Sequence, residues 1–152
     1  MLLFLRNNAY FILSILSFLN CESIDLSSNS FKKDLDLLNE QTEPIILKSN
    51  GGQCQLIIVP EFQGRVMTST SNGLLGSSYG WINDNLISSG EIQPHINAYG
   101  GEDRFWLGPE GGQFSIFFEQ GNPFDLDHWQ TPASIDTEPF RLDSFSNKHA
   151  KL

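Results

Sequence analysis

The fold class is indicated most directly by the stretch Ile45-Ile46-Leu47-Lys48-Ser49-Asn50-Gly51-Gly52-Gln53-Cys54-Gln55-Leu56-Ile57-Ile58-Val59. Apolar runs at 45–47 and 54–59 flank a polar centre that contains Asn50-Gly51. Asn-Gly supplies the positive φ angles of a tight turn between antiparallel strands, so the stretch predicts a β-hairpin. Cys54 opens the second run, and we expect it to be a small buried hydrophobic residue.

The same pattern continues downstream of the hairpin. Arg65 to Thr70 predicts a strand that ends at Asn72-Gly73, and Gln113 to Glu119 predicts another. Glu138 to Phe145 also alternates as a strand would. Short strands separated by Gly, Asn and Pro turns are typical of an all-β protein, here an antiparallel β-sandwich or barrel.

One helix is expected before the hairpin. Phe31, Leu35 and Leu38 recur at positions i, i+4 and i+7, with charged residues between them, and this spacing is typical of a short amphipathic helix. Pro44 marks the change to the strand pattern. The predicted fold is therefore all-β with one short N-terminal helix.

The N-terminal residues predict export. Arg6 is followed by an apolar run from Ala9 to Leu19, then by Cys21 and a polar segment. This run of eleven residues, interrupted only by Ser14 and Ser17, suits a secretory signal better than a membrane-spanning helix. The order resembles a bacterial lipoprotein leader, so we expect a signal peptide at 1–21 with lipidated Cys21, a polar tether at 22–30 and a location in the periplasm or at the outer membrane. A plain signal peptide cut nearby and an ordinary apolar first strand are the alternatives.

Composition excludes several classes of function. The 152 residues carry 9 Lys+Arg against 18 Asp+Glu, for a formal charge of −9, and no basic cluster that would bind nucleic acid. With 39% hydrophobic residues the chain can build a core. Neither a GxxxxGK[ST] nor a GxGxxG motif occurs, so we expect no phosphate-binding loop and no cofactor.

Metal binding is not expected either. If Cys21 is acylated, Cys54 is the only thiol left, so neither a disulfide nor a Cys/His zinc array can form. Asp125-Leu126-Asp127-His128 offers oxygen and nitrogen ligands, but it has no partner elsewhere in the sequence and more readily forms a solvated turn.

The segment from Gln93 to Gly112 carries the densest chemistry. It combines glycines, aromatic rings and paired charges, a mixture that suits a sugar better than a phosphate. The alternatives are an arginine that pairs with carboxylates to stabilise a loop, aromatic residues that belong to the core, and a histidine that braces the loop. Asp136 and Glu138 are interpreted as the polar edge of a strand. The candidate sugar-binding residues are Arg65, His95, Glu102, Asp103, Arg104 and Trp106.

Several motifs carry a family resemblance. The stretches Arg65-Val66-Met67-Thr68-Ser69-Thr70, Tyr79-Gly80-Trp81-Ile82-Asn83, GGEDRFWLGPEGGQFSIFF and NPFDLDHWQTPASIDTEPF, within about Phe31 to Phe140, look like a group of uncharacterised exported bacterial proteins. That group is related to the galactose mutarotase-like (aldose 1-epimerase-like) β-supersandwich. The resemblance implies this fold and a sugar-facing surface.

The resemblance also bears on catalysis. Mutarotases carry an Asn before a His-Gly-Gly turn and a Trp soon after it, and Asn97, Gly100, Gly101 and Trp106 occupy comparable positions, with Tyr99 in place of the histidine. Family chemistry is acid/base ring opening by a glutamate and a histidine. The glutamate would fall beyond Leu152, so we expect this chain to lack the base, and its catalytic residues are unknown.

These expectations define one functional hypothesis with two alternatives. Residues 31–152 are expected to be the N-terminal part of a β-sandwich domain, because the strand pattern near residue 140 has only a short polar tail after it. The hypothesis is an exported protein that binds or processes a sugar or oligosaccharide, attached to a membrane through lipidated Cys21. The alternatives are a non-catalytic surface lipoprotein and an inactive truncated gene product.

Overall fold

The structure is a computed structural model that describes residues 29–152. The predicted signal peptide, Cys21 and most of the predicted tether lie outside the described residues. Within 29–152, no helix combines the length and the apolar character that crossing a bilayer requires.

The predicted N-terminal helix is confirmed as α2 (Phe31–Gln41). It begins after Ser30, whose side-chain oxygen accepts a hydrogen bond from the backbone N–H of Lys33 at 3.3 Å and so caps the first turn. Phe31 and Leu38 are fully buried. The spacing that predicted the helix therefore also marks the face that packs inward.

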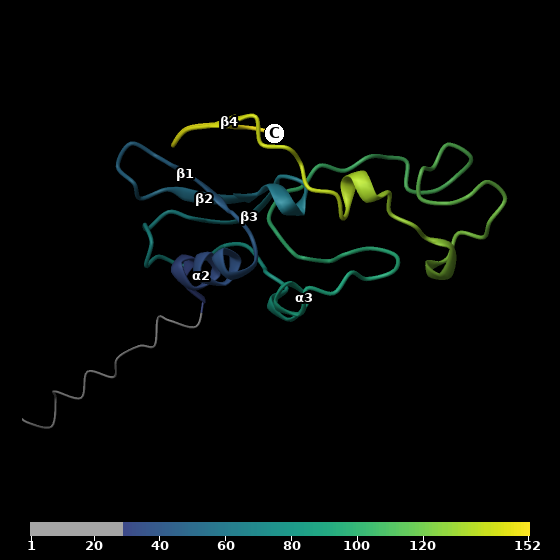
Figure 1. Cartoon of the computed structure of the whole chain (residues 1–152), viewed down its shortest axis with the longest axis horizontal. Helices are drawn as coiled ribbons and strands as arrows, with labels where there is room; N and C mark the ends of the chain where they lie inside the picture. The colour runs from purple at the N-terminus through teal and green to yellow at the C-terminus, as the bar shows by residue number, and fades with distance from the viewer. Residues whose placement is uncertain (1–28) are drawn as a thin grey trace, which may run out of the picture.

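The predicted hairpin and the strand after it are confirmed as an antiparallel sheet. β1 (Ile45–Lys48) pairs with β2 (Gln55–Val59), with Ile45 opposite Ile58. β2 then pairs with β3 (Arg65–Thr70), and the register shifts between Ile57 and Ile58. The strand order is β1-β2-β3, and Figure 1 shows the three strands side by side.

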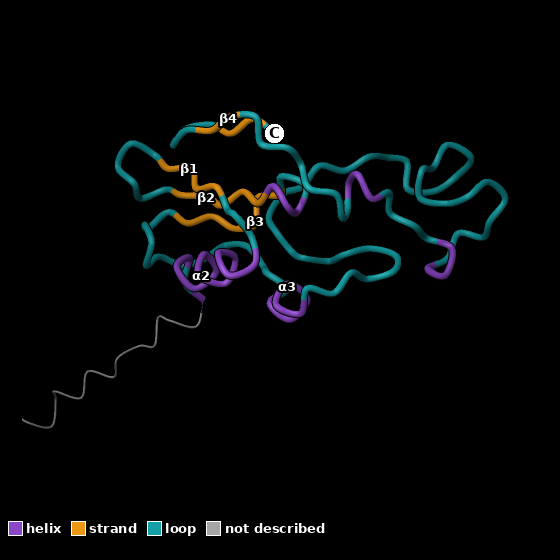
Figure 2. Tube along the Cα trace, in the orientation of Figure 1, coloured by secondary structure: helices purple, strands orange, loops and turns teal. Residues whose placement is uncertain are grey.

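The main core lies between this sheet and α2. Phe31 and Leu38 from the helix pack in one cluster with Ile57, Val59 and Met67 from the strands. Figure 2 shows the helix along one side of the sheet. Burying an apolar side chain of this size contributes about 1.5–3 kcal/mol, so this layer accounts for much of the stability of the described part.

The C-terminal segment lies on the side of the sheet away from α2 (Figure 1). The backbone N–H of Lys48 donates to the carbonyl of Asn147 at 2.8 Å, and the N–H of Phe140 donates to the carbonyl of Pro60 at 2.9 Å. This segment ends in a second antiparallel pair, β4 (Ser144–Phe145) with β5 (Ala150–Lys151). The described chain thus contains two small antiparallel sheets and a helical layer.

Two predicted strands are corrected. Gln113 to Glu119 forms turns and bends, because no neighbouring strand pairs with it among the described residues. Its Phe117 is fully buried by aromatic stacking. The strand expected over Glu138 to Phe145 is only Ser144–Phe145, and the polar tail after it supplies its partner strand, β5.

Two further expectations are wrong. A second helix, α3 (Asp84–Ser89), forms although only one helix was expected, because Asn83 accepts from the N–H of Leu86 and Gly90 ends the helix at φ 64°. Cys54 is exposed, since β2 begins one residue later and leaves Cys54 in the hairpin loop.

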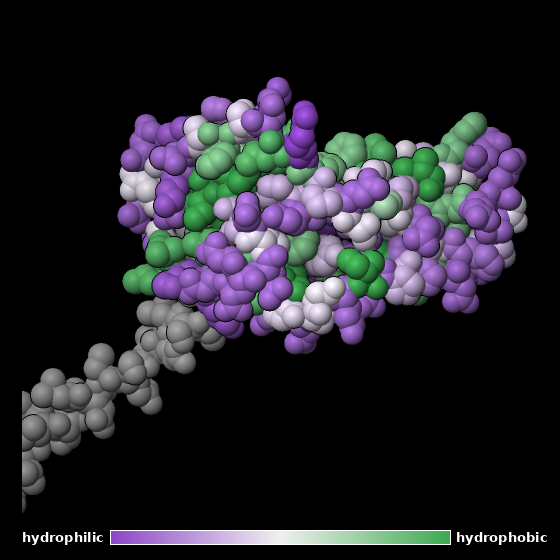
Figure 3. Space-filling view, in the orientation of Figure 1, coloured by the Kyte–Doolittle hydropathy of each residue, from purple (hydrophilic) through white to green (hydrophobic). Residues whose placement is uncertain are grey.

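Residues 105–130 carry little regular structure. They form a long excursion away from the sheet (Figure 1), with 3-10 turns η4 (Leu126–His128) and, after it, η5 (Ala133–Ile135). Large apolar side chains are exposed here, among them Phe114 and Phe124. Figure 3 shows hydrophobic residues among hydrophilic ones on this part of the surface.

Candidate functional site

Arg65 lies on β3 and is only 2% exposed. Its Nη1 donates to the carbonyl of Gly100 at 2.8 Å, and its guanidinium carbon lies 5.6 Å from the centre of the Tyr99 ring. Gly101 has φ +108°, and a Cβ there would lie 2.7 Å from Cδ of Arg65, so only glycine leaves room for this side chain. Burial, reinforced by the charge of Arg104, lowers the pKa of Arg65 to about 10.

Asp136 supplies the buried negative charge and is 3% exposed. Its carboxylate accepts from the backbone N–H of Asn97 at 3.0 Å and from the side-chain amide of Asn97 at 2.7 Å. Arg104 donates to the carbonyl of Ile135 at 2.6 Å, and its Nη2 lies 3.7 Å from Oδ1 of Asp136. Burial lowers the pKa of Arg104, and Asp136 opposes this shift.

We call Arg65, Asn97, Tyr99, Arg104 and Asp136 the arginine–aspartate cluster. It contains two guanidinium groups and one carboxylate. Nε and Nη2 of Arg65 and Nε of Arg104 are buried, and they have no hydrogen-bond partner within 29–152. Buried polar groups are normally satisfied, so these three donors without a partner are the unusual feature of the cluster.

An aromatic row extends from this cluster. The guanidinium of Arg104 lies over the ring of Trp106 at 4.2 Å, and Trp106 stacks on Phe117 with 5.0 Å between ring centres. Phe117 stacks in turn on Trp129 at 4.7 Å. Nε1 of Trp106 donates to Oε1 of Glu110 at 2.8 Å. The Trp106 side chain thus contacts Arg104, Phe117 and Glu110.

Glu102 and Asp103 run along the free edge of β3. The N–H of Glu102 donates to the carbonyl of Val66 at 2.8 Å, and the N–H of Val66 donates to the carbonyl of Asp103 at 2.9 Å. The carboxylate of Glu102 accepts from the N–H of Ser69 at 2.6 Å and from its hydroxyl at 2.9 Å. Glu102 therefore anchors the glycine-rich segment to the sheet.

His95 forms its hydrogen bonds with residues outside the arginine–aspartate cluster. Its Nδ1 is 2.7 Å from the carbonyl oxygen of Trp129, and its own carbonyl accepts from the N–H of Thr131 at 3.0 Å. These bonds tie the end of the excursion to the segment that precedes it, the loop-bracing arrangement that was one interpretation of the sequence.

The structure thus groups part of the predicted site. Arg104 lies next to Asp136, whose charge also acts on Arg65, and Trp106 contacts Arg104. Glu102 and Asp103 lie along the edge of β3 instead. Asp136 was expected at the polar edge of a strand, and this is wrong, because it follows η5 and is buried against Asn97. No local pattern could have shown this, since the contact joins residues 39 positions apart.

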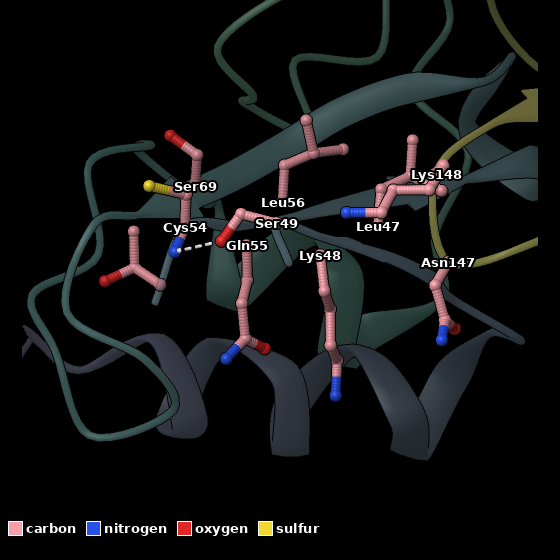
Figure 4. Close-up of a pocket in the computed structure, with 10 residues that line it drawn as sticks. Leu47, Lys48, Ser49, Cys54, Gln55, Leu56, Ser69, Asn147 and Lys148 are labelled. Carbon is pink, nitrogen blue, oxygen red and sulfur yellow. Dashed lines mark hydrogen bonds between the residues drawn. The ribbon is translucent and has the colours of Figure 1, made fainter. Parts of the chain in front are cut away.

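A second hollow lies on the β1–β2 hairpin, with a volume of about 400 Å³ (Figure 4). Leu47 and Leu56 are apolar members of its lining, and Figure 4 shows Lys148 beside Leu47 at one end. The exposed Cys54 is at its rim, where its N–H donates to the hydroxyl of Ser49 at 3.2 Å. This hollow brings together none of the predicted sugar-binding residues.

The described residues hold no group of three or more His, Cys, Asp or Glu side chains placed to bind a metal ion. Asp125 caps η4, and its carboxylate accepts from the N–H of His128 at 3.1 Å and lies 2.5 Å from Nδ1 of that residue. The hydrogen bond from the His128 side chain lowers the pKa of Asp125. The segment forms a solvated turn.

Comparison with known proteins adds a family. Searches of the curated proteins and of the solved structures each found no match. The model of one family matches residues 29–152, a range that includes every element described above and the arginine–aspartate cluster. This chain belongs to that family, which is described as a family of unknown function, DUF6786.

Proposed function

We propose that this protein is an exported carbohydrate-binding protein built on an antiparallel β-sandwich of the galactose mutarotase-like type. The arginine–aspartate cluster is the observation that carries the proposal. Its guanidinium groups offer hydrogen-bond donors beside a carboxylate and an indole ring. Sugars are bound by such charged groups through pairs of hydroxyls.

The sandwich part of the proposal is supported by β2. Ile57 and Val59 face α2, and the alternation of a strand places Leu56 and Ile58 on the opposite face. Ile45 and Val66 lie opposite Ile58 in the neighbouring strands, so this second face is apolar as well. A sheet with two apolar faces is stable when a layer covers each of them.

Binding is better supported than a reaction. Asp136 is committed to Asn97 through backbone and side-chain bonds, and Nδ1 of His95 is committed to the carbonyl of Trp129. An acid/base group has to exchange its proton with the substrate, and these contacts hold both side chains in the frame of the protein. We therefore assign a sugar or oligosaccharide as ligand and no reaction.

A second candidate function is a non-catalytic surface lipoprotein in which the glycine-rich segment is architectural. Glu102 and Arg104 favour it, because both side chains bond to backbone groups, at Ser69 and Ile135. In either case the proposed location is the periplasm or the outer membrane, with attachment through lipidated Cys21. Incorporation of labelled fatty acid into the wild type and not into Cys21→Ser would support attachment, and equal incorporation would contradict it.

A glycan screen separates the two functions. The wild type and Arg104→Lys, which keeps the charge but loses the planar fork, are screened against mono- and oligosaccharides, and the melting temperature of each is measured. Sugar binding that weakens in Arg104→Lys at an unchanged melting temperature supports the first function. A lower melting temperature of Glu102→Ala and Arg104→Ala, with no sugar bound by the wild type, supports the second.

A further inference from the structure

A separate cleft lies between the first half of α2 and the segment that leads into α3. Its volume is about 310 Å³, at the lower end of the range for small-molecule sites. No member of the arginine–aspartate cluster lines it. We call it the α2 cleft, and the residues that matter here are Asn29, Lys33, Asp34, Tyr79, Trp81 and Asp84.

Backbone hydrogen bonds fix the walls of the α2 cleft. The N–H of Ser78 donates to the carbonyl of Asn29 at 3.1 Å, and the side-chain amide of Asn29 donates to the carbonyl of Ser78 at 3.2 Å. The carbonyl of Trp81 accepts from the N–H of Gly101 at 2.8 Å. The cleft is therefore preformed, which lowers the entropic cost of binding.

Two aromatic side chains on one wall are open to solvent. Tyr79 is 60% exposed and Trp81 is 63% exposed. Among residues 29–152, arginines lie over the rings of Tyr99 and Trp106, so neither Tyr79 nor Trp81 has a protein cation on its ring. Exposed indole and phenol faces attract cations through their π electrons.

The cleft also carries two carboxylates, Asp34 from α2 on the opposite wall and Asp84 from the start of α3 on the aromatic side. One oxygen of Asp34 accepts from the hydroxyl of Ser78, and Asp84 accepts from the hydroxyl of Ser88 at 2.9 Å. Neither carboxylate forms a salt bridge within the described part of the chain. Burial raises the pKa of Asp34, the charge of Asp84 raises it further, and Lys33 opposes the shift. With one lysine against two aspartates, the cleft favours a cation.

We propose that the α2 cleft binds a small organic ammonium ion of amino-sugar size, with its ammonium group at Asp34 and Asp84 and its ring against Trp81. Such a ligand uses both walls, since the carboxylates accept the ammonium hydrogens and the indole packs on the ring. The overall charge of −9 also favours the approach of a cation. This proposal does not depend on the arginine–aspartate cluster.

Three matched ligands test the role of charge. Glucosamine, glucose and N-acetylglucosamine share a pyranose ring, but only glucosamine carries a positive charge. Calorimetric titration of the full chain at neutral pH is expected to show saturable binding of glucosamine and binding of the other two that is about tenfold weaker or more. Equal affinities for glucosamine and glucose, or no binding of glucosamine, would overturn the proposal.

Matched variants test the location. Asp34→Asn and Trp81→Ala are expected to weaken glucosamine binding about tenfold, whereas Asp36→Asn, an exposed aspartate on the same helix, should leave it unchanged. Asp84→Asn gives an independent test if Asp34→Asn does not fold, because Asp84 is exposed. An equal loss in Asp36→Asn would show a general effect of charge and contradict the site. Glucosamine binding that persists in Arg104→Lys separates this result from the proposed function.

Discussion

Asn97 gives both its backbone N–H and its side-chain amide to the carboxylate of Asp136, which lies 39 residues further along the chain. Both residues are buried, with Asn97 fully inaccessible. The carbonyl of Ile135, the neighbour of Asp136, also accepts from Arg104. These bonds close the excursion of 105–130 onto the sheet, and they make Asp136 the residue on which the geometry of the proposed sugar site depends.

Removing this carboxylate should destabilise the protein. Asp136→Ala leaves the buried guanidinium of Arg65 without its nearby negative charge. It also leaves the backbone N–H of Asn97 unpaired, and the side-chain amide of Asn97 keeps only the 3.4 Å bond to the carbonyl of Gln93. Breaking a buried charged pair typically costs about 3–5 kcal/mol, so we expect a decrease of about 3 kcal/mol in the free energy of unfolding, measured by urea denaturation.

An exposed aspartate provides the control for this measurement. Asp143 pairs with Lys151 at 2.7 Å, and about half of the Asp143 side chain is exposed. Asp143→Ala should therefore change the free energy of unfolding by less than about 1 kcal/mol. If Asp136→Ala cost no more than Asp143→Ala, the buried network would have no structural role.

We expect the close contact between position 101 and Arg65 to require glycine at position 101. Gly101→Ala places a Cβ against Arg65 at φ +108°, where side chains are rarely tolerated. We expect a loss of about 2 kcal/mol or more in thermal or urea unfolding. Gly111→Ala is the matched substitution, since nothing lies within 4 Å of a Cβ there, and its effect should stay within about 0.5 kcal/mol. Similar losses in both variants would contradict the close contact at Arg65.

The raised pKa of Asp34 predicts a stability effect with a definite sign. Burial and the charge of Asp84 raise this pKa, with Lys33 and the hydrogen bond from Ser78 opposing it, so the folded state binds a proton at a higher pH than the unfolded chain does. At pH values above the pKa of Asp34 in the folded state, the ionised carboxyl therefore lowers the free energy of unfolding. This loss disappears as the pH falls from the pKa of the folded state towards the pKa of the unfolded chain.

Thermal melts of Asp34→Asn and the wild type across acidic and neutral pH check this sign. The amide cannot ionise, so the difference in melting temperature, variant minus wild type, should become more positive as the pH rises through the folded pKa of Asp34. Asp36→Asn, on the exposed face of α2, should not show this trend. If the difference in melting temperature for Asp34→Asn did not change with pH, or became more negative as the pH rises, burial would not be disfavouring the ionised form of Asp34.

The sequence predicted the elements whose structure depends on residues close together in the chain. The spacing of Phe31, Leu35 and Leu38 and the Asn50-Gly51 turn describe α2 and the β1–β2 hairpin, because a helix face and a short hairpin are encoded by neighbouring residues. The helix α3 was missed although Asn83 and Gly90 are its cap residues, because its amphipathic pattern is short.

Long-range contacts account for the rest. Gln113 to Glu119 has the composition of a strand, but a strand needs a partner, and Phe117 instead packs between Trp106 and Trp129. Arg65 and Arg104 were recognisable as candidates by residue type. The contact between Arg104 and Asp136 depends on the path of residues 105–130, which the spacing of residues in the sequence does not encode.

Tryptophan fluorescence tests the proposed sugar site most directly. Trp81→Phe removes the tryptophan fluorescence of the α2 cleft. The remaining tryptophan fluorescence comes from Trp106 and Trp129 beside the arginine–aspartate cluster. Titration with a panel of neutral mono- and oligosaccharides should give a saturable change with at least one sugar, and adding Arg104→Lys to this variant should weaken or abolish that change. No response to any sugar, or the same response with Lys at position 104, would contradict sugar binding at this cluster.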